Sequence, residues 1–333
     1  MTGCTATAYY WQAARGEMHL LADARPIQNV IDDPATPTST RAKLRLVGRT
    51  RRFASQALLL PDNGSYKKYV ALHRPYVVWN VFATPEFSLA AVRHCFPIAG
   101  CVDYQGYFSH ADALAAARRL AAAGDDTYVA GVPAFSTLGH FDDPVLSSML
   151  RWDDDTLVAT LFHELAHQKL YLPGDTAFNE SFASFVADQG LRQWLAAQHR
   201  ARPPDRRCAR RRFDALIDQA RAGLNRLYRQ PLPAAMLRAR KADQLAQLVL
   251  EVQALPDGEN YRAWLTEGLN NAKLVPIALY RDEVPAFAAL YAEVAGRWAD
   301  FYAAVRTLTT LSADRRRARL TALAARAVDP PCR

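Results

Sequence analysis

The sequence predicts an α+β protein that is mainly α, with a small β-sheet packed beside a helix that carries an HExxH motif and with a helical C-terminal part. Segments rich in β-branched and aromatic residues, which are typical of strands, occur before residue 150. From residue 153 onward almost every segment repeats apolar residues at the spacing of one helix face. Half of the residues are hydrophobic and 22% are charged, which is the balance of a globular protein with a substantial core.

The N-terminal elements follow from local patterns. Residues 9–27 and 36–58 have apolar residues at helical spacing, and the second segment is followed by the turn signal PDNGS. Residues 74–87 are dense in β-branched and aromatic residues between prolines and form the best predicted strand. A helix is expected over 110–124, closed by a glycine, and a short strand over 127–132.

The chain shows no internal repeat and no low-complexity linker, and 333 residues suffice for one large domain. We therefore expect residues 1–8 to be an N-terminal tether of the lipoprotein type and residues 9–333 to form a single domain. Within that domain, one lobe (9–150) would hold helices and the small sheet, and the other (151–333) would be helical.

The five cysteines bear on where the protein resides. They are Cys4, Cys95, Cys101, Cys208 and Cys332. The opening "MTGCTATAYYW" contains the TGC run that follows the hydrophobic stretch of a bacterial lipoprotein signal, so we expect Cys4 to be lipidated and the protein to be anchored at the periplasmic face of the cell envelope. Four cysteines then remain for two disulfides, and Cys95 and Cys101 are the closest pair in sequence. The alternative is a cytoplasmic protein with five reduced thiols.

The charge pattern raises the question of an anionic partner. The net charge is +8, and arginines cluster at 200–213 and 314–319. Neither cluster is interleaved with aromatic residues as stacking platforms are, so we expect no nucleic-acid binding. No run of 18 or more apolar residues occurs, so the predicted membrane contact is limited to a lipid on Cys4.

The segment "LFHELAHQKLYLPGDTAFNESFASF" (161–185) predicts a metal site. A helix is expected from the acidic DDDT at 153–156 to about Leu172. His163 and His167 lie one turn apart on it, so both imidazoles face one ion. Two neutral imidazoles and a carboxylate suit zinc and leave a fourth position for water. Glu164 would lie beside that water as a general base.

Glu180 is the expected third ligand. A metzincin would need glycine and histidine at the offsets that Leu170 and Pro173 occupy, so that subtype is excluded. An antiparallel helix pair that breaks at the Pro-Gly step returns Glu180 to the level of His167. Without a metal, the motif would bury two histidines and two glutamates without compensation, which is costly.

The run "HELAH" followed by "NESFA" resembles the gluzincin peptidases, in which a glutamate from the next helix completes an HExxH site. A closer resemblance is to the bacterial family of predicted aminopeptidases, many of which look like lipoproteins. It rests on "GCTATAYYWQAARGEMHLL", "RPYVVWNVFATPEFSL", "CFPIAGCVDYQGYF", "STLGHFDDPVLSSML", "HELAHQKLY", "FNESFASFVADQG" and "LNNAKLVPIALY". The resemblance implies one zinc ion per chain held by His163, His167 and Glu180, with Glu164 as the catalytic base.

Hydrolysis of a peptide bond requires further groups besides the metal, and the sequence offers candidates for them. Tyr280 is a candidate to stabilise the oxyanion. Glu86 would hold the free amine of a peptide substrate while the strand before it pairs with the substrate backbone. Asn270 and Asn271 would either bind that backbone or cap a turn. We expect an aminopeptidase of the envelope. An envelope endopeptidase and a non-catalytic scaffold in which zinc is structural remain as alternatives.

Overall fold

The structure is a computed structural model that describes residues 3–96, 100–134, 137, 141–201, 207–256, 258–266, 268–278 and 283–327. The chain divides into two compact units. Unit 1 comprises residues 1–79, 131–202 and 281–329, and unit 2 comprises residues 80–130, 203–280 and 330–333. Each unit is built from segments that alternate along the chain, whereas the two lobes expected from the sequence are consecutive stretches. Whether the two units form the single predicted domain stays a prediction.

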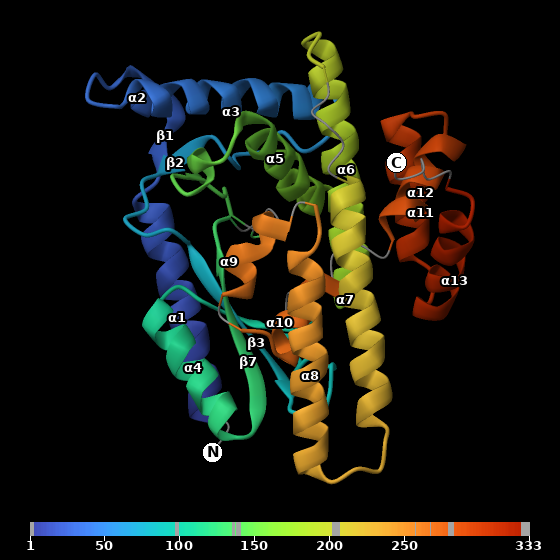
Figure 1. The fold of residues 1–333 in the computed structure, drawn as a ribbon. Helices are drawn as coiled ribbons and strands as arrows, with labels where there is room; N and C mark the ends of the chain where they lie inside the picture. The colour runs from blue at the N-terminus through green and yellow to red at the C-terminus, as the bar shows by residue number, and fades with distance from the viewer. Residues whose placement is uncertain are drawn as a thin grey trace. The chain divides into compact units, whose positions relative to one another are not determined.

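The N-terminal part of unit 1 combines three helices with a small sheet (Figure 1). The helices are α1 (Gly3–Ala22), α2 (Ile27–Asp32) and α3 (Thr38–Ala57). In the sheet, β2 (Lys68–Val70) pairs antiparallel with β1 (Arg25–Pro26) and parallel with β8 (Val145–Leu146). The segment between α3 and β2 closes back on the sheet, because the backbone N–H of Tyr66 donates to the carbonyl of Asp143 at 2.6 Å.

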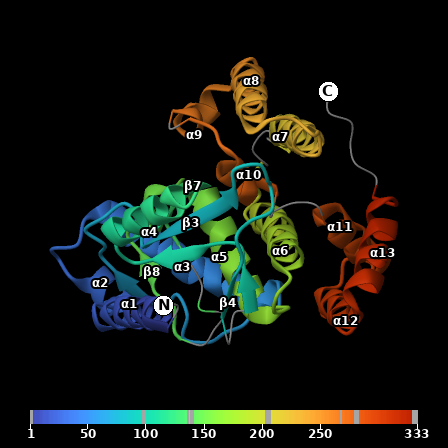
Figure 2. The same ribbon diagram turned by 90° about the horizontal axis from the view of Figure 1, so that it is seen from below.

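The rest of unit 1 is helical. A short 3-10 turn (Met149–Arg151) precedes α5 (Asp154–Lys169) and α6 (Thr176–Ala197), which lie side by side (Figures 1 and 2). The C-terminal helices are α11 (Val284–Glu293), α12 (Trp298–Thr309) and α13 (Ala313–Ala324). Phe182 of α6 is fully buried, with its ring centroid 5.8 Å from that of Phe287 and 6.1 Å from that of Phe301. These aromatic contacts hold α11 and α12 against α6.

A buried arginine links α13 to the start of α6. Arg316 is 8% exposed, and its guanidinium donates to Asp175 Oδ2 at 2.7 and 3.2 Å. Asp175 also caps α6, because its Oδ1 accepts the backbone N–H of Phe178 at 3.2 Å. The Asp175 carboxylate thus pairs with a buried guanidinium and also accepts a backbone N–H of the first turn of α6, which has no partner within the helix.

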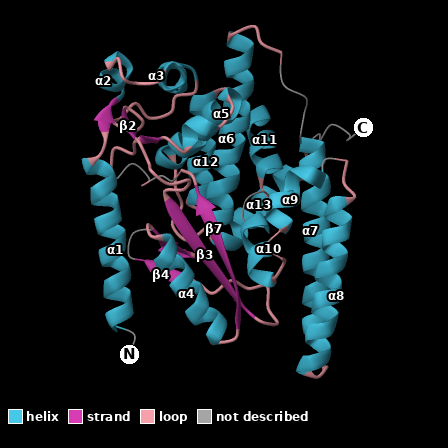
Figure 3. Ribbon diagram, turned by 60° about the vertical axis from the view of Figure 1, so that its left-hand side comes forward, coloured by secondary structure: helices cyan, strands magenta, loops and turns pink. Residues whose placement is uncertain are grey.

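Unit 2 contains the remaining strands and a helical hairpin (Figure 3). Its sheet has the order β6 (Gln105–Tyr107), β3 (Val78–Pro85), β7 (Asp125–Val132), and the first residues of β3 and the last of β7 extend into unit 1. The helices are α4 (His110–Ala122), α7 (Arg207–Tyr228), α8 (Ala234–Gln253), a 3-10 turn (Gly258–Tyr261), α9 (Arg262–Leu265) and α10 (Asn271–Ala278). Buried Leu224 of α7 and Leu248 of α8 belong to the core of this hairpin.

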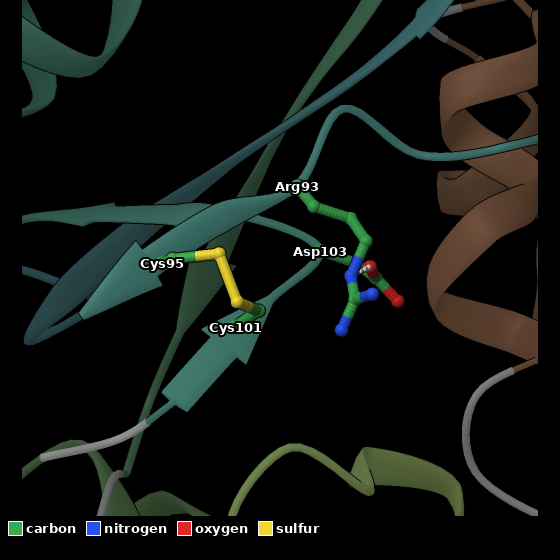
Figure 4. Close-up of a disulfide and its surroundings, with 4 residues drawn as sticks. All are labelled: Arg93, Cys95, Cys101 and Asp103. Atoms are coloured by element: carbon green, nitrogen blue, oxygen red, sulfur yellow. Dashed lines mark ion pairs between the residues drawn. A yellow bond between two sulfur atoms is a disulfide. The ribbon is translucent and has the colours of Figure 1, made fainter. Parts of the chain in front are cut away.

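A disulfide joins Cys95 and Cys101 in unit 2. Figure 4 shows it linking β4 (His94–Phe96) to β5 (Gly100–Val102), where the two cysteines are directly opposite in the antiparallel register. The ion pair of Arg93 with Asp103, at 3.8 Å, lies beside the same hairpin. The side chains of Cys4 and Cys208 and the whole of Cys332 fall outside the described residues.

The mainly helical α+β prediction is confirmed, and every helix and strand expected before residue 150 is present. The first helix is displaced from 9–27 to Gly3–Ala22, because Arg25 and Pro26 leave it to pair with β2. The strands of two or three residues were not predicted, since so short a segment carries no periodic signal. No helix in the described part of the chain is long and apolar enough to cross a bilayer.

The half-buried position of Glu17 in α1 predicts that the free energy of unfolding depends on pH. Its Oε1 atom is buried without a hydrogen-bond partner among the described residues. Burial, and then the negative charge of Asp143, raise the pKa of Glu17 from 4.5 to about 7. The folded state therefore binds this proton more tightly than the unfolded state, and its contribution to stability is full below pH 4.5 and is lost as the pH rises through about 7.

Replacing Glu17 with Gln is expected to remove this loss. At about pH 8 the variant should be more stable than the unaltered chain by about 1–3 kcal/mol, and near pH 5 the difference should shrink toward zero. Urea denaturation at the two pH values measures the free energies of unfolding. The same difference at both pH values would contradict the assignment of the effect to Glu17 ionisation.

Candidate metal centre

The helix that carries the HExxH motif is fixed at its start by acidic residues. Asp153 precedes α5 and caps it, since its Oδ1 accepts the backbone N–H of Thr156 at 2.9 Å. Asp154 and Asp155 follow in the first turn, where their negative charges interact favourably with the positive end of the helix dipole and stabilise the helix. One face of α5 is completely buried through Leu157, Val158, Leu161, Phe162, Leu165 and Ala166. This burial fixes the rotation of the helix and so the direction of the motif.

The connection from α5 to α6 is longer than expected. The sequence predicted a helix to about Leu172, but α5 ends at Lys169 and Leu170 is extended with φ −157°. Asn179 of α6 explains the difference. Its Oδ1 accepts the backbone N–H of Leu172 at 2.7 Å, and its Nδ2 donates to the carbonyl of the same residue at 2.8 Å. Gly174, with φ +82°, then completes the turn.

Two histidines and one glutamate converge between α5 and α6. The Nε2 atoms of His163 and His167 lie 3.1 Å apart. Glu180 places Oε2 at 3.2 Å from His163 Nε2 and Oε1 at 3.7 Å from His167 Nε2. These residues form a group with metal-ligand geometry, with ligand atoms all within 4.8 Å of one another. The convergence predicted from the sequence is therefore present in the structure.

This donor set fits a zinc ion. Zinc–nitrogen bonds of about 2.0–2.1 Å place two ligand atoms of a tetrahedral site roughly 3.3 Å apart. The observed separations of 3.1, 3.2 and 3.7 Å are close to that value. With their hydrogens on Nδ1, the two neutral imidazoles would both direct an Nε2 lone pair to the same point, where one cation can accept them. Within the described residues the group has three members, which leaves a coordination position for a small ligand.

The two glutamates of the centre differ in their electrostatics. Burial raises the pKa of Glu180, but hydrogen bonds from His163 and His167 outweigh it and bring the pKa to about 2. Glu180 is thus a carboxylate, the form that binds a cation. Burial raises the pKa of Glu164 to about 7, with His163 opposing the change and the charges of Glu180 and Asp143 adding to it. Glu164 therefore sits in an environment that favours its protonated form until a cation is nearby.

A polar network that the sequence did not indicate ties the motif helix to the β1–β2–β8 sheet. Gln168, next to His167, donates from Nε2 to Ser65 Oγ at 3.2 Å and to Asp143 Oδ2 at 3.3 Å. Its Oε1 accepts from Asn63 Nδ2 at 2.7 Å. Asp143 is 2% exposed. Since Gln168 follows Glu164 by one helical turn, the network holds the face of α5 that carries Glu164.

Tyr171 is a second residue that the sequence did not single out. It is half-buried and directly precedes Leu172, whose backbone is held by Asn179, the neighbour of Glu180. Burial, and then the negative charge of Glu180, raise the pKa of the Tyr171 hydroxyl. The phenol therefore remains a hydrogen-bond donor close to the carboxylate ligand. Its place four residues after His167, in "HELAHQKLY", was the signal available in the sequence.

Asn179 is expected to be a structural requirement of the centre. Asn179→Ala removes both bonds to Leu172 and leaves a backbone N–H and carbonyl without these partners, so we expect a loss of about 2–3 kcal/mol in the free energy of unfolding. Asn179→Asp keeps the acceptor but sets a buried carboxylate oxygen against the Leu172 carbonyl, so it should lose at least as much as Asn179→Ala. Chemical denaturation of the three proteins measures this order. An Ala variant as stable as the unaltered chain would contradict the role given to Asn179.

The other predicted site residues lie in unit 2 or outside the described part. The carboxylate of Glu86 accepts two hydrogen bonds from Arg238, at 2.5 and 2.8 Å. Asn270 donates to the carbonyl of Thr127 at 2.9 Å. Their roles in substrate binding stay predictions. Tyr280 falls outside the described residues, so its predicted contact with an oxyanion is not described.

Asn271 is buried with 0% exposure and has partners on both side-chain polar atoms. Its Nδ2 donates to the carbonyls of Glu86 and Ser88 at 3.0 Å, and its Oδ1 accepts from Tyr228 at 2.8 Å. Contact with a substrate would require these bonds to be exchanged. The strand that precedes Glu86 is β3, the central strand of its sheet. The eight-residue β3 has β7 on one side and the three-residue β6 on the other, so β6 covers only part of one edge, and the expected pairing with a substrate backbone stays a prediction.

The fold and the site together define a mainly helical α+β protein with a candidate metal centre of two histidines and one glutamate. The family model described as "Putative aminopeptidase" matches residues 8–320, and the chain belongs to that family. The curated proteins and the solved structures compared with the chain give no significant match.

Proposed function

We propose that this protein is a zinc-dependent aminopeptidase of the gluzincin type. The observation that carries the proposal is the convergence of His163, His167 and Glu180 on one point, with Glu164 next to the first of them in the HExxH motif. Membership of the aminopeptidase family supports a peptidase hydrolase. A ligand group of three, counted over the described residues, favours catalysis over a structural zinc, which is closed by four protein ligands.

Each residue of the centre has a proposed task. His163, His167 and Glu180 would hold the ion. Zinc, when bound, supplies a Lewis acid that polarises the peptide carbonyl and makes water acidic enough to attack at neutral pH. Glu164 accepts a proton from the attacking water at its carboxylate and delivers it to the leaving amine nitrogen. The cation would favour the ionised form of Glu164, whose pKa burial otherwise raises to about 7.

Tyr171 is the proposed donor to the oxygen that becomes negative when the peptide carbonyl is attacked. Tyr171→Phe should lower kcat roughly tenfold to a hundredfold with little change in KM, because the lost bond forms only in the transition state. Zinc content and stability should be unchanged. Tyr76→Phe, an exposed tyrosine, is the control. A Tyr171→Phe enzyme with unaltered kcat would remove Tyr171 from the mechanism.

The location of the protein is also a proposal. We infer from "TGC" at residues 2–4 that a lipid on Cys4 anchors the protein to the periplasmic face of a bacterial envelope, and that it acts there on peptides. Cys4→Ala should move the protein from the membrane fraction to the supernatant. Equal distribution of the two proteins would contradict a lipid on Cys4 and favour the cytoplasmic alternative.

Metal dependence tests the proposal as a whole. Protein stripped by a chelator should bind one zinc per chain, and peptide hydrolysis should return in proportion to the zinc bound. Isothermal titration gives the stoichiometry, and the same samples give the activity. Zinc bound at one per chain without any hydrolysis would favour the scaffold alternative, while no zinc binding would reject the metal centre.

A further inference from the structure

Unit 2 contains an open cavity of about 450 Å³, which none of the residues of the candidate metal centre lines. Its floor is apolar and is formed by α8 and the residues before α10, including Leu245, Val249 and Leu269. The rest of the lining is charged or polar apart from two alanines, and consists of Glu86, Asp126, Arg238, Lys241, Asn270, Ala242 and Ala246; we call the Glu86–Arg238 pair its rim pair. A volume in the range of ~300–1,000 Å³, with an apolar lining and a few polar groups, is typical of small-molecule sites.

Glu86 and Arg238 hold each other in place but remain accessible to solvent. The side chains of Arg238 and Glu86 are 58% and 30% exposed, and the guanidinium donates from Nε and Nη2 to the two carboxylate oxygens. Behind the pair, Lys241 donates to the carbonyl of Glu86 at 2.8 Å and to Asp126 Oδ2 at 2.6 Å. The Lys241–Asp126 pair is nearly buried, with side chains 10% and 17% exposed. The backbone of Glu86 is therefore fixed while its carboxylate stays at the surface.

Two opposite charges that neutralise each other at the edge of an apolar floor are complementary to a molecule that carries both charges and an apolar group. The ammonium of such a ligand would replace Arg238 on Glu86. Its carboxylate would replace Glu86 on the guanidinium fork, which matches carboxylate geometry. One ion pair within the protein is replaced by two with the ligand, whose own charges lose water, so the net gain comes mainly from covering the partly exposed Val249 and Leu269 with an aliphatic chain.

We propose that this cavity binds a free α-amino acid with an aliphatic side chain, such as leucine. All lining residues belong to unit 2, and the proposal depends neither on a metal ion nor on the proposed peptidase activity. In an aminopeptidase such a ligand would be a reaction product.

The test is isothermal titration of leucine into the full-length chain kept metal-free by a chelator, so that binding at the metal centre is excluded. Leucine should bind saturably at one site, and alanine roughly tenfold to a hundredfold more weakly, because it covers less of the floor. N-acetyl-leucine and leucinamide, which each lack one charge, should both bind at least about tenfold more weakly than leucine.

Two substitutions on α8 localise the site. Ala246 lines the cavity and is exposed, so Ala246→Phe should fold normally and fill the space, reducing leucine affinity more than about tenfold. Gln247 is exposed on the same helix but does not line the cavity, so Gln247→Phe should bind leucine as the unaltered chain does. Absence of saturable binding, or equal affinity of the two Phe variants, would overturn the proposal. Leucinamide as tight as leucine would overturn the role of Arg238.

Discussion

Glu164→Gln protein is expected to bind one zinc per chain and to hydrolyse peptides about 10²- to 10⁴-fold more slowly than the unaltered enzyme. The amide has nearly the size of the carboxylate but cannot accept the proton of the attacking water. Glu164 is not a member of the ligand group, so its replacement leaves the metal ligands in place. Initial rates at saturating peptide, together with metal analysis of the same sample, make the measurement.

The control for Glu164 is Glu17→Gln, which replaces another half-buried carboxylate in unit 1 with an amide. Its kcat at neutral pH should stay near that of the unaltered enzyme. A Glu164→Gln protein that retains activity would remove this residue from the mechanism. Loss of zinc in the same variant would instead show that Glu164 contributes to the ligand set.

Glu180→Gln is expected to weaken zinc binding more than about 100-fold and to abolish hydrolysis at limiting zinc. The carboxylate is the one charged ligand of the group, and its two oxygens face different histidines at 3.2 and 3.7 Å. An amide supplies a single neutral oxygen and turns its nitrogen toward the other imidazole. Competition with a chromophoric chelator measures the affinity directly.

Asp188→Asn is the matched control for Glu180. It removes one negative charge from the same helix, two turns further along, outside the group of ligand atoms. Its zinc affinity should stay within about threefold, since a charge at that distance is screened. Equal losses in the Glu180 and Asp188 variants would show that overall charge, rather than ligation by Glu180, sets the affinity.

The candidate centre could be predicted because its information is local. The helical spacing of His163 and His167 and the Pro-Gly break before Glu180 lie within one short stretch. The helix that carries the motif was predicted too long, because α5 ends at Lys169 rather than at about Leu172. Glu180 still reaches the two histidines because Asn179 binds the backbone of Leu172 and holds the connection against α6. The sequence pattern did not indicate this contact.

The long-range contacts could not be predicted. Gln168 meets Asn63 and Ser65 across more than 100 residues, and no periodicity indicates such a pair. The same holds for the cavity, where Glu86 meets Arg238 from a distant helix. Strands as short as Val145–Leu146 exist only through their pairing partners. Local patterns therefore predict the elements and the motif, while the packing that supports them depends on the tertiary fold.

The most direct measurement is mass-spectrometric digestion of a mixed peptide pool by zinc-loaded protein, with each peptide present in a free and an N-acetylated form. Glu164→Gln protein serves as the blank. The proposed aminopeptidase predicts stepwise loss of N-terminal residues from the free peptides alone. Internal cuts in both sets would contradict it and make the protein an endopeptidase. Absence of cleavage by zinc-loaded protein would contradict catalysis itself and leave zinc with a structural role.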